Sequence, residues 1–224
     1  MTTAEKSLKS KAKQHTVYTL ANGDRVIGVT TAIGLLEKPA LKFWANKIGL
    51  QGIKISEYVD SLAEVGTTAH AMILADLSGK GAETALEGKD ADTKTLAENC
   101  YLSFCEWRKG HKVEPIALER PLVSERYRYG GTSDFIGRVD DAIEIIEFKT
   151  GGIWPEHFIQ LSACSQLAQE NGLVSEPIRR FRVLSIPRAE TESFDEKVKT
   201  SVSVEWQIFE HCLAIYELKK KLEK

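Results

Sequence analysis

In the second half of the chain, two carboxylates and one amine stand at the ends of two neighbouring apolar runs. Asp134 precedes one run, and Glu147 and Lys149 close the next. The two runs meet at a polar pair, Asp140 and Asp141, which predicts a β-hairpin, although Asp-Asp is a weaker turn than Asn-Gly or Asp-Gly. The sequence therefore predicts that the three charged side chains lie at the open end of a hairpin.

The position of the turn sets the register of this hairpin. The predicted facing pairs are Val139 with Ala142, Arg138 with Ile143, Ile136 with Ile145, and Asp134 with Glu147. Facing residues lie on the same side of a sheet with Cβ atoms about 4.5–5.5 Å apart, and alternation brings Lys149 to that side too. A slip of one residue would undo this arrangement.

Two facing carboxylates repel each other, so Asp134 and Glu147 require a cation, a shared proton or water. A hard divalent cation fits best, because Mg²⁺ takes one or two carboxylates and keeps positions open for a substrate phosphate. In the alternative interpretation, Asp134 lies in a turn and Glu147 pairs with Lys149 on a solvated strand. We favour the metal site, because a run that is apolar on both faces indicates an interior strand, where unpaired charges are costly.

These residues also resemble a known nuclease core. Asp134 with Glu147-Phe-Lys149 resembles the Asp…(Asp/Glu)-x-Lys motif of the PD-(D/E)XK nuclease superfamily. The longer spelling, Gly130-Gly-Thr-Ser-Asp with Glu-Phe-Lys-Thr-Gly, is similar to its RecB-like branch of phage and mitochondrial genome-maintenance exonucleases. Ser133 stands where the superfamily name has Pro.

The resemblance implies a role for each residue of the core. Asp134 and Glu147 would bind Mg²⁺ or Mn²⁺ together with the backbone carbonyl of Phe148. Lys149 would orient or deprotonate the attacking water and stabilise the developing charge. His70, in Gly66-Thr-Thr-Ala-His70, resembles the Gly-x-x-x-His element that adds a metal ligand or a supporting contact, against the alternative of a helix-face histidine.

Gln160 resembles the first residue of the Gln-x-x-x-Tyr motif of the RecB branch, where it would act near the scissile phosphate or orient Lys149. Cys164 replaces the tyrosine of that motif, so its strand-guiding part is not expected here. Two carboxylates are weaker candidates. Glu64 lies near His70 in the sequence. Glu119 lies in the strand expected over residues 111–124. We interpret it first as a solvated glutamate, and the alternative is that this strand points it toward the site.

Two groups of cationic and aromatic residues suit a nucleic acid. Arg126, Arg128 and Tyr129 would contact phosphates and bases next to the site, or else form ordinary pairs on an edge strand. Arg180 and Arg182 alternate onto one strand face as a track for the phosphate backbone, or else charge an edge strand.

Further elements follow from hydrophobic periodicity and turn residues. Expected strands cover residues 15–29 (a hairpin around Asn22 and Gly23), 111–124, 178–186 and 198–206. Expected helices cover residues 39–50, 56–77 (interrupted at Gly66), 93–109, 154–172 and 206–222, with a surface loop over residues 78–92 and Trp44 in the core. The fold class is α/β, with a restriction-endonuclease-like core, a mixed central β-sheet flanked by helices, and an N-terminal β-hairpin and helical region.

Composition narrows the class of protein. The 224 residues fit a single domain, divided into an N-terminal hairpin and helices (residues 1–110) and a catalytic sheet with the C-terminal helix (residues 111–224). A net charge of −2 means that contacts to DNA must come from local patches.

The four cysteines show no zinc or iron–sulfur spacing, so we expect reduced thiols and no cluster. No apolar run reaches the length of a membrane span, and we expect a frayed or basic tail over residues 1–14.

We therefore expect a Mg²⁺- or Mn²⁺-dependent DNA exonuclease of DNA repair, recombination or phage DNA processing. The resemblance implies a bacterial or phage-encoded protein of the cytoplasm. Its partner would be DNA, and a recombination or replication protein is a further candidate partner. A structure-specific or restriction-type endonuclease shares the same chemistry. A third interpretation is a catalytically silent module that binds DNA or protein with a nuclease fold.

Overall fold

The computed structural model describes residues 16–189 and 191–223. The basic tail expected over residues 1–14 lies outside them. The strands are β1 (Tyr18–Thr19), β2 (Arg25–Gly28), β3 (Val113–Ser124), β4 (Tyr129–Val139), β5 (Ala142–Lys149), β6 (Arg180–Ser185) and β7 (Asp195–Lys199). The helices are α1 (Val29–Ile33), α2 (Pro39–Leu50), α3 (Ile55–Leu77), α4 (Ala91–Lys109), α5 (Pro155–Glu170) and α6 (Ser203–Leu222), with a 3₁₀ helix over Ala82–Leu86.

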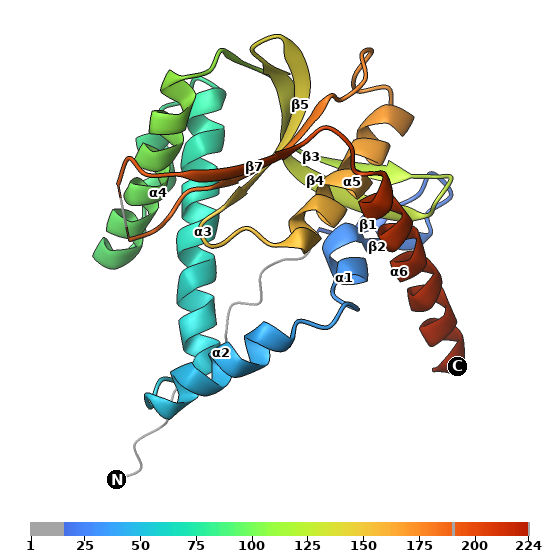
Figure 1. Ribbon diagram of the computed structural model, residues 1–224, viewed down its shortest axis with the longest axis horizontal. Coiled ribbons are helices and arrows are strands. Elements are labelled where there is room, and N and C mark those ends of the chain that lie inside the picture. The colour runs from blue at the N-terminus through green and yellow to red at the C-terminus, as the bar shows by residue number, and fades with distance from the viewer. Residues whose placement is uncertain (1–15, 190, 224) are drawn as a thin grey trace.

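In the described part of the chain the strands form one mixed sheet, in the order β1-β2-β4-β5-β6-β7, with β3 also paired to β4 (Figure 1). β4 is antiparallel to β3 and β5, whereas β2 runs parallel to β4 and β6 runs parallel to β5. The predicted α/β class, a mixed sheet flanked by helices with an N-terminal strand pair, is confirmed.

The hairpin of β4 and β5 has the predicted register. Val139 faces Ala142, and the ladder continues to Phe135 opposite Ile146. Asp140 begins the turn with a φ of 54°, a left-handed conformation that aspartate tolerates better than most residues. Asp134 and Glu147 follow directly after the last paired residues, at the open end of the hairpin.

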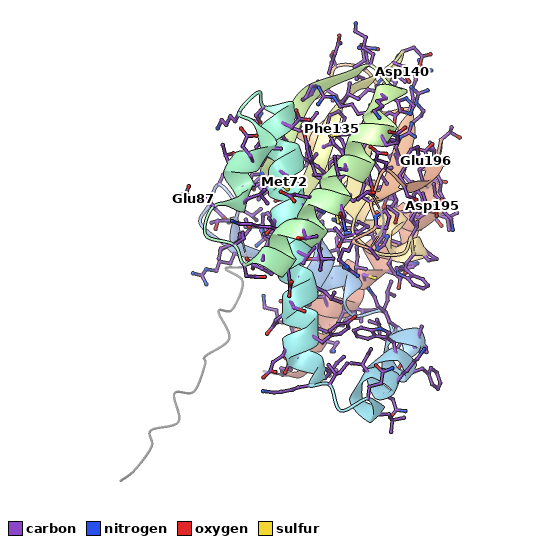
Figure 2. The ribbon with its side chains drawn as sticks, turned by 90° about the vertical axis from the view of Figure 1, so that its left-hand side faces the viewer. Met72, Glu87, Phe135, Asp140, Asp195 and Glu196 are labelled. Atoms are coloured by element: carbon purple, nitrogen blue, oxygen red, sulfur yellow. The ribbon has the colours of Figure 1, made fainter. Side chains whose placement is uncertain are left out.

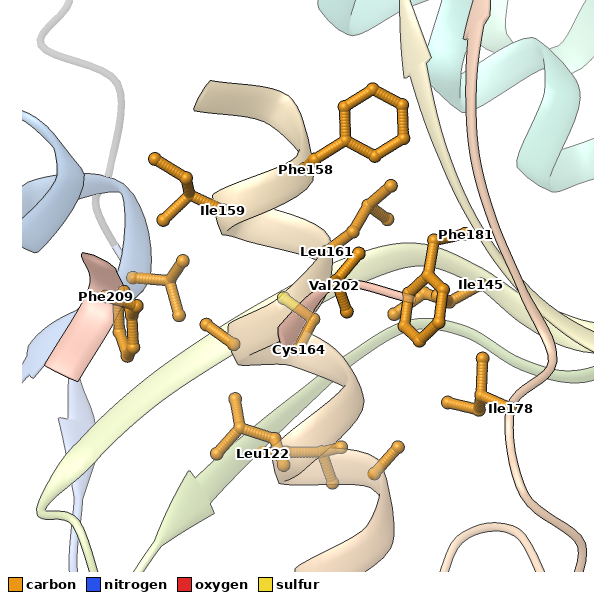
Figure 3. Close-up of a cluster of buried hydrophobic side chains, with 14 of the residues drawn as sticks. Leu122, Ile145, Phe158, Ile159, Leu161, Cys164, Ile178, Phe181, Val202 and Phe209 are labelled. Carbon is orange, nitrogen blue, oxygen red and sulfur yellow. The ribbon is translucent and has the colours of Figure 1, made fainter. Parts of the chain in front are cut away.

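Helices cover both faces of the sheet (Figure 1). On one face, α5 packs with α1 and α6 around Ile136, Ile143 and Ile145. Figure 3 shows α5 directing Phe158, Leu161 and other apolar side chains into this cluster.

On the other face, α3 and α4 cover Phe135, Ile146 and Phe148. In Figure 2 these two helices lie in front of the sheet, with the buried Met72 of α3 and Phe135 behind them labelled. Because β4 and β5 are covered on both sides, Glu144 and Glu147 of β5 are buried.

Three sequence expectations need correction. The strand expected over residues 198–206 is wrong: β7 lies earlier, as a largely exposed edge strand, and α6 already begins at Ser203. The apolar alternation of Val202, Val204 and Trp206 belongs to the start of that helix. The helix α3 is continuous through Gly66, and α2 buries none of its residues, so Trp44 is only partly covered, beside Tyr58.

The four cysteines, Cys100, Cys105, Cys164 and Cys212, are free thiols. None of the helices within the described ranges combines the length and the apolar content that crossing a membrane requires.

Candidate active site

The structure brings six predicted site residues together where β5 ends. Glu147, Phe148 and Lys149 are the last residues of β5, and Asp134 approaches from the neighbouring β4. His70 comes from α3 on one face of the sheet, and Gln160 comes from α5 on the other. The site thus lies where the two helical layers meet the open end of the central hairpin.

Asp134 is held by one contact on each carboxylate oxygen. Oδ2 accepts a hydrogen bond of 2.8 Å from the backbone N–H of Phe148, and Oδ1 lies 3.4 Å from Nδ1 of His70. The ring of His70 also meets the edge of Phe148, with centroids 6.0 Å apart. The predicted convergence of His70 on Asp134 is therefore present.

Glu147 is the most enclosed charged residue of the site. Its side chain is 3% exposed, and Oε1 accepts hydrogen bonds from Lys149 Nζ at 2.5 Å and from Gln160 Nε2 at 2.7 Å. Oε2 is buried and has no hydrogen-bond partner among the described residues. Glu147 and Lys149 do pair, but in a buried position rather than on the solvated strand of the alternative interpretation.

The two carboxylates have pKa values that move in opposite directions. Burial would raise the pKa of Asp134, but His70, Lys149 and the Phe148 amide outweigh burial and lower it. Burial, followed by the charge of Asp134, raises the pKa of Glu147. Burial opposes the charged forms of His70 and Lys149, yet the neighbouring carboxylates raise the pKa of both. The site is therefore arranged around negative charge that is only partly compensated.

A third carboxylate joins this group from β3. Ligand atoms of His70, Glu119 and Asp134 all lie within 4.8 Å of one another. These residues and Phe148 line a small cavity of about 10 Å³. This is about the volume that one water molecule requires.

The donor set fits a divalent cation. Two of the three converging ligand groups are carboxylates, whose oxygens suit hard cations such as Mg²⁺ and Mn²⁺. The unpartnered Oε2 of the buried Glu147 is a further oxygen donor that needs a partner.

Glu119 was only weakly indicated by the sequence. In the structure its φ of 42° places it in the left-handed region, within a strand where glutamate rarely adopts that conformation. The pairing of Leu118 with Phe135 and of Arg120 with Ser133 places Glu119 opposite Asp134. Its side chain is exposed, as the preferred interpretation expected, and it also approaches His70 and Asp134, as the alternative expected. Glu64, the other minor candidate, pairs instead with Lys89 on the surface.

The arginines and the tyrosine expected to contact DNA are not gathered at the site. Tyr129 is fully buried and donates a hydrogen bond to the carbonyl of Ala163, so it cannot stack on a base. Arg128 forms an ion pair with Asp24, and the guanidinium of Arg126 lies over the ring of Tyr127. Contacts within the protein thus account for the positions of these three side chains without a nucleic acid.

Arg180 and Arg182 share a strand face as expected, but that face is covered. Arg182 is 4% exposed, binds Glu144 through two hydrogen bonds of 2.9 and 3.1 Å, and also pairs with Glu196. Arg180 pairs with the same buried Glu144 and with Asp141. The expected backbone track is corrected to an internal ion network.

No family model matches the chain, and no curated protein matches it in sequence. Among solved structures, it is similar to a crystal structure of LHK-Exo in complex with dAMP. The identity is 13%, the TM-score is 0.36, and the match covers 73% of this chain and 86% of that chain. At this level of similarity, function has to be inferred from the site itself.

Proposed function

We propose that the protein is a metal-dependent deoxyribonuclease that hydrolyses phosphodiester bonds as an exonuclease. One observation carries the proposal: His70, Glu119 and Asp134 converge within 4.8 Å beside the buried Glu147, which binds Lys149 and Gln160. Acidic groups, an imidazole, a lysine and an amide at one sheet edge supply both the ligands and the polar groups that phosphodiester hydrolysis requires. DNA repair, recombination or phage DNA processing is the setting that the resemblance implies.

Each residue has a role in this proposal. His70, Glu119, Asp134 and Glu147, with the Phe148 carbonyl, would hold Mg²⁺ or Mn²⁺. A bound divalent cation lowers the pKa of water and neutralises phosphate charge. Lys149 places an ammonium next to Glu147, where it orients the attacking water and offsets negative charge on the phosphate.

Gln160 fixes the arrangement from the side of α5. Its amide donates to the same Glu147 oxygen that Lys149 binds, so it limits the positions that Lys149 can take. Cys164, which replaces the tyrosine of the resembling motif, is 2% exposed, and its Sγ lies 3.8 Å from the carbonyl of Thr132. It packs in the core and contributes no guiding hydroxyl.

The proposal is tested by incubating linear and covalently closed circular DNA with the protein and Mg²⁺ or Mn²⁺. We expect loss of linear DNA only, and no cleavage by Lys149→Ala although it still binds DNA. Lys109→Ala is the matched control, because Lys109 also pairs with a carboxylate but lies on the surface of α4. Cleavage of the circle would instead establish an endonuclease. Binding without cleavage under either metal would establish the silent module.

A further inference from the structure

The site opens into a groove that runs away from it along the N-terminal hairpin. One hollow of about 280 Å³ is lined at one end by Glu119 and Gln160, and at the other by Tyr18 and Thr30. A second hollow of about 530 Å³ extends past β2 and α1 to α6. The two hollows share the lining residues Thr16, Tyr18 and Thr30, so they adjoin.

The floor of this groove is constructed by the Gly-Gly-Thr segment that precedes Asp134. The ring of Tyr18 lies on Gly130, where a Cβ atom would come within 2.2 Å of the ring. Its hydroxyl forms a hydrogen bond of 3.0 Å with Oγ1 of Thr132. Gly131 is similarly crowded, because a Cβ atom there would lie 2.7 Å from the side chain of Val29. The glycines therefore let the hairpin lie directly on β4 and shape a floor that leads to the site.

The lining has the chemistry of a path for a single nucleic-acid strand. Thr30, Thr31 and Thr132 line a groove that Arg25 and Tyr216 line farther from the site. Arg25 is the only cation among the described residues that line the groove, and it forms no ion pair with another described residue. Single strands bind through bases stacked on aromatic side chains and through cations that track the backbone, and Tyr216 and Arg25 supply one group of each kind.

Resting on the proposed nuclease function, we propose that this groove binds one unpaired DNA strand that extends from the scissile phosphate. The threonine hydroxyls contact its backbone, Arg25 binds a phosphate, and a base stacks on Tyr216. The strand passes over the Tyr18–Thr132 floor between the catalytic residues and α6, which Figure 1 shows close to β1, β2 and α1.

The first test measures binding of a fluorescent single-stranded oligo(dT) 20-mer in EDTA, so that no cleavage occurs. We expect Arg25→Ala to weaken binding about tenfold and to reduce the salt dependence of log K by about 0.7, the value for one phosphate on a single strand. Tyr216→Leu should weaken binding about tenfold through lost stacking, while its apolar side chain maintains the packing against the cluster beneath α5. Arg179→Ala is the control, because Arg179 is exposed beside Ile143, at the end of β5 opposite to Lys149.

Controls separate this proposal from the proposed function. Hydrolysis of bis(p-nitrophenyl) phosphate with Mn²⁺ reports the site without the groove, and the control Arg179→Ala should match the parent in this assay. If the parent cleaves DNA but Arg25→Ala and Tyr216→Leu bind oligo(dT) as the parent does, the groove proposal is overturned and the nuclease stands. Loss of duplex binding with unchanged single-strand binding would overturn it as well. If the parent cleaves neither substrate, the nuclease assignment itself fails, whereas oligo(dT) binding still tests the groove. Thermal midpoints within a few degrees of the parent confirm that the variants are folded.

Discussion

Glu119 lies at the site because β3 pairs with β4: Leu118 faces Phe135 and Arg120 faces Ser133, so Glu119 stands opposite Asp134, with a φ of 42°. An unusual conformation of this kind costs free energy and persists where the surrounding structure enforces it. Its carboxylate then completes the group with His70 and Asp134. At the scale of single residues, metal binding is therefore expected to depend on Glu119.

Glu119→Gln should weaken Mn²⁺ binding about tenfold or more, because the amide removes a charge from the ligand group. Calorimetric titration with Mn²⁺ in the absence of DNA measures this directly. Glu64→Gln is the matched control, since Glu64 pairs with Lys89 on the surface. Equal losses in the two variants would contradict the assignment.

Gly130 offers a second prediction at this scale. Gly130→Ala places a Cβ within 2.2 Å of the Tyr18 ring, so the N-terminal hairpin has to shift. We expect a destabilisation of about 1–3 kcal/mol, as for other overpacked positions. Gly49→Ala in α2 meets no atom within 4 Å and should be neutral or stabilising by up to about 1 kcal/mol. Urea unfolding compares them, and a stable Gly130→Ala would show that the hairpin has room to move.

At the scale of elements, β5 and β6 are held together by ion pairs as well as by backbone hydrogen bonds. Glu144 is completely buried between Arg180 and Arg182, and its removal leaves the buried Arg182 with Glu196 alone. Glu144→Gln should therefore lower the free energy of unfolding by about 3–5 kcal/mol. Glu176→Gln removes a surface partner of Arg138 and should cost less than about 1 kcal/mol. Similar costs in the two variants would show that the buried network is not structural.

The start of α5 should give the protein a specific pH dependence. The backbone N–H of Trp154 donates to Nδ1 of His157 at 3.2 Å, and this bond requires an unprotonated nitrogen. Burial, with a smaller effect of Lys149, lowers the pKa of His157 to about 4. The unfolded chain thus binds the proton more readily, so stability is lost as the pH falls from about 6.5 to about 4. Because the ring is only partly buried, we expect a loss of about 1–2 kcal/mol after solvent screening.

His157→Gln tests this effect, because glutamine at this position of a helix retains an acceptor that does not titrate. Unfolding free energies at pH 7 and pH 4.5 should differ less in this variant than in the parent. His211→Gln, on the exposed side of α6, should leave the difference unchanged. A parent-like pH dependence of His157→Gln would show that protonation of His157 does not matter for stability.

The sequence predicted elements best where a local signal also specified the tertiary contact. The turn at Asp140 and the alternation around it predicted the register of β4 and β5, and Pro39 marked the start of α2. The prediction of a strand over residues 198–206 was wrong because β7 is defined by its pairing with β6 rather than by an apolar pattern of its own.

The site residues were predictable to a similar extent. Asp134, Glu147 and Lys149 follow from the hairpin, since strand alternation brings them together. Burial was not predictable: Tyr129 and Arg182 look like surface residues in the sequence, and only the packing of α5, α6 and α4 encloses them. Glu119 was only the weaker of two interpretations, because the pairing of β3 with β4 that places it opposite Asp134 cannot be read from the sequence of β3 alone.

At the scale of the whole molecule, the sheet joins the two halves of the chain. The cluster beneath α5 and the cluster beneath α3 and α4 both include residues of β4 and β5. The N-terminal half supplies α3 and α4 as well as β2, which pairs with β4 in the C-terminal half. Residues 1–110 and 111–224 are therefore expected to form one folding unit rather than two.

This predicts a single cooperative unfolding transition. Urea titrations followed by far-UV circular dichroism and by tryptophan fluorescence should give the same midpoint, because Trp107 packs in one cluster and Trp206 against the other. A fragment of residues 111–224 would expose Phe135, Ile146 and Phe148, which α3 and α4 cover in the full chain, and should not fold. Separate midpoints, or a fragment with dispersed methyl resonances, would instead divide the protein into two domains and make the position of His70 relative to Asp134 adjustable.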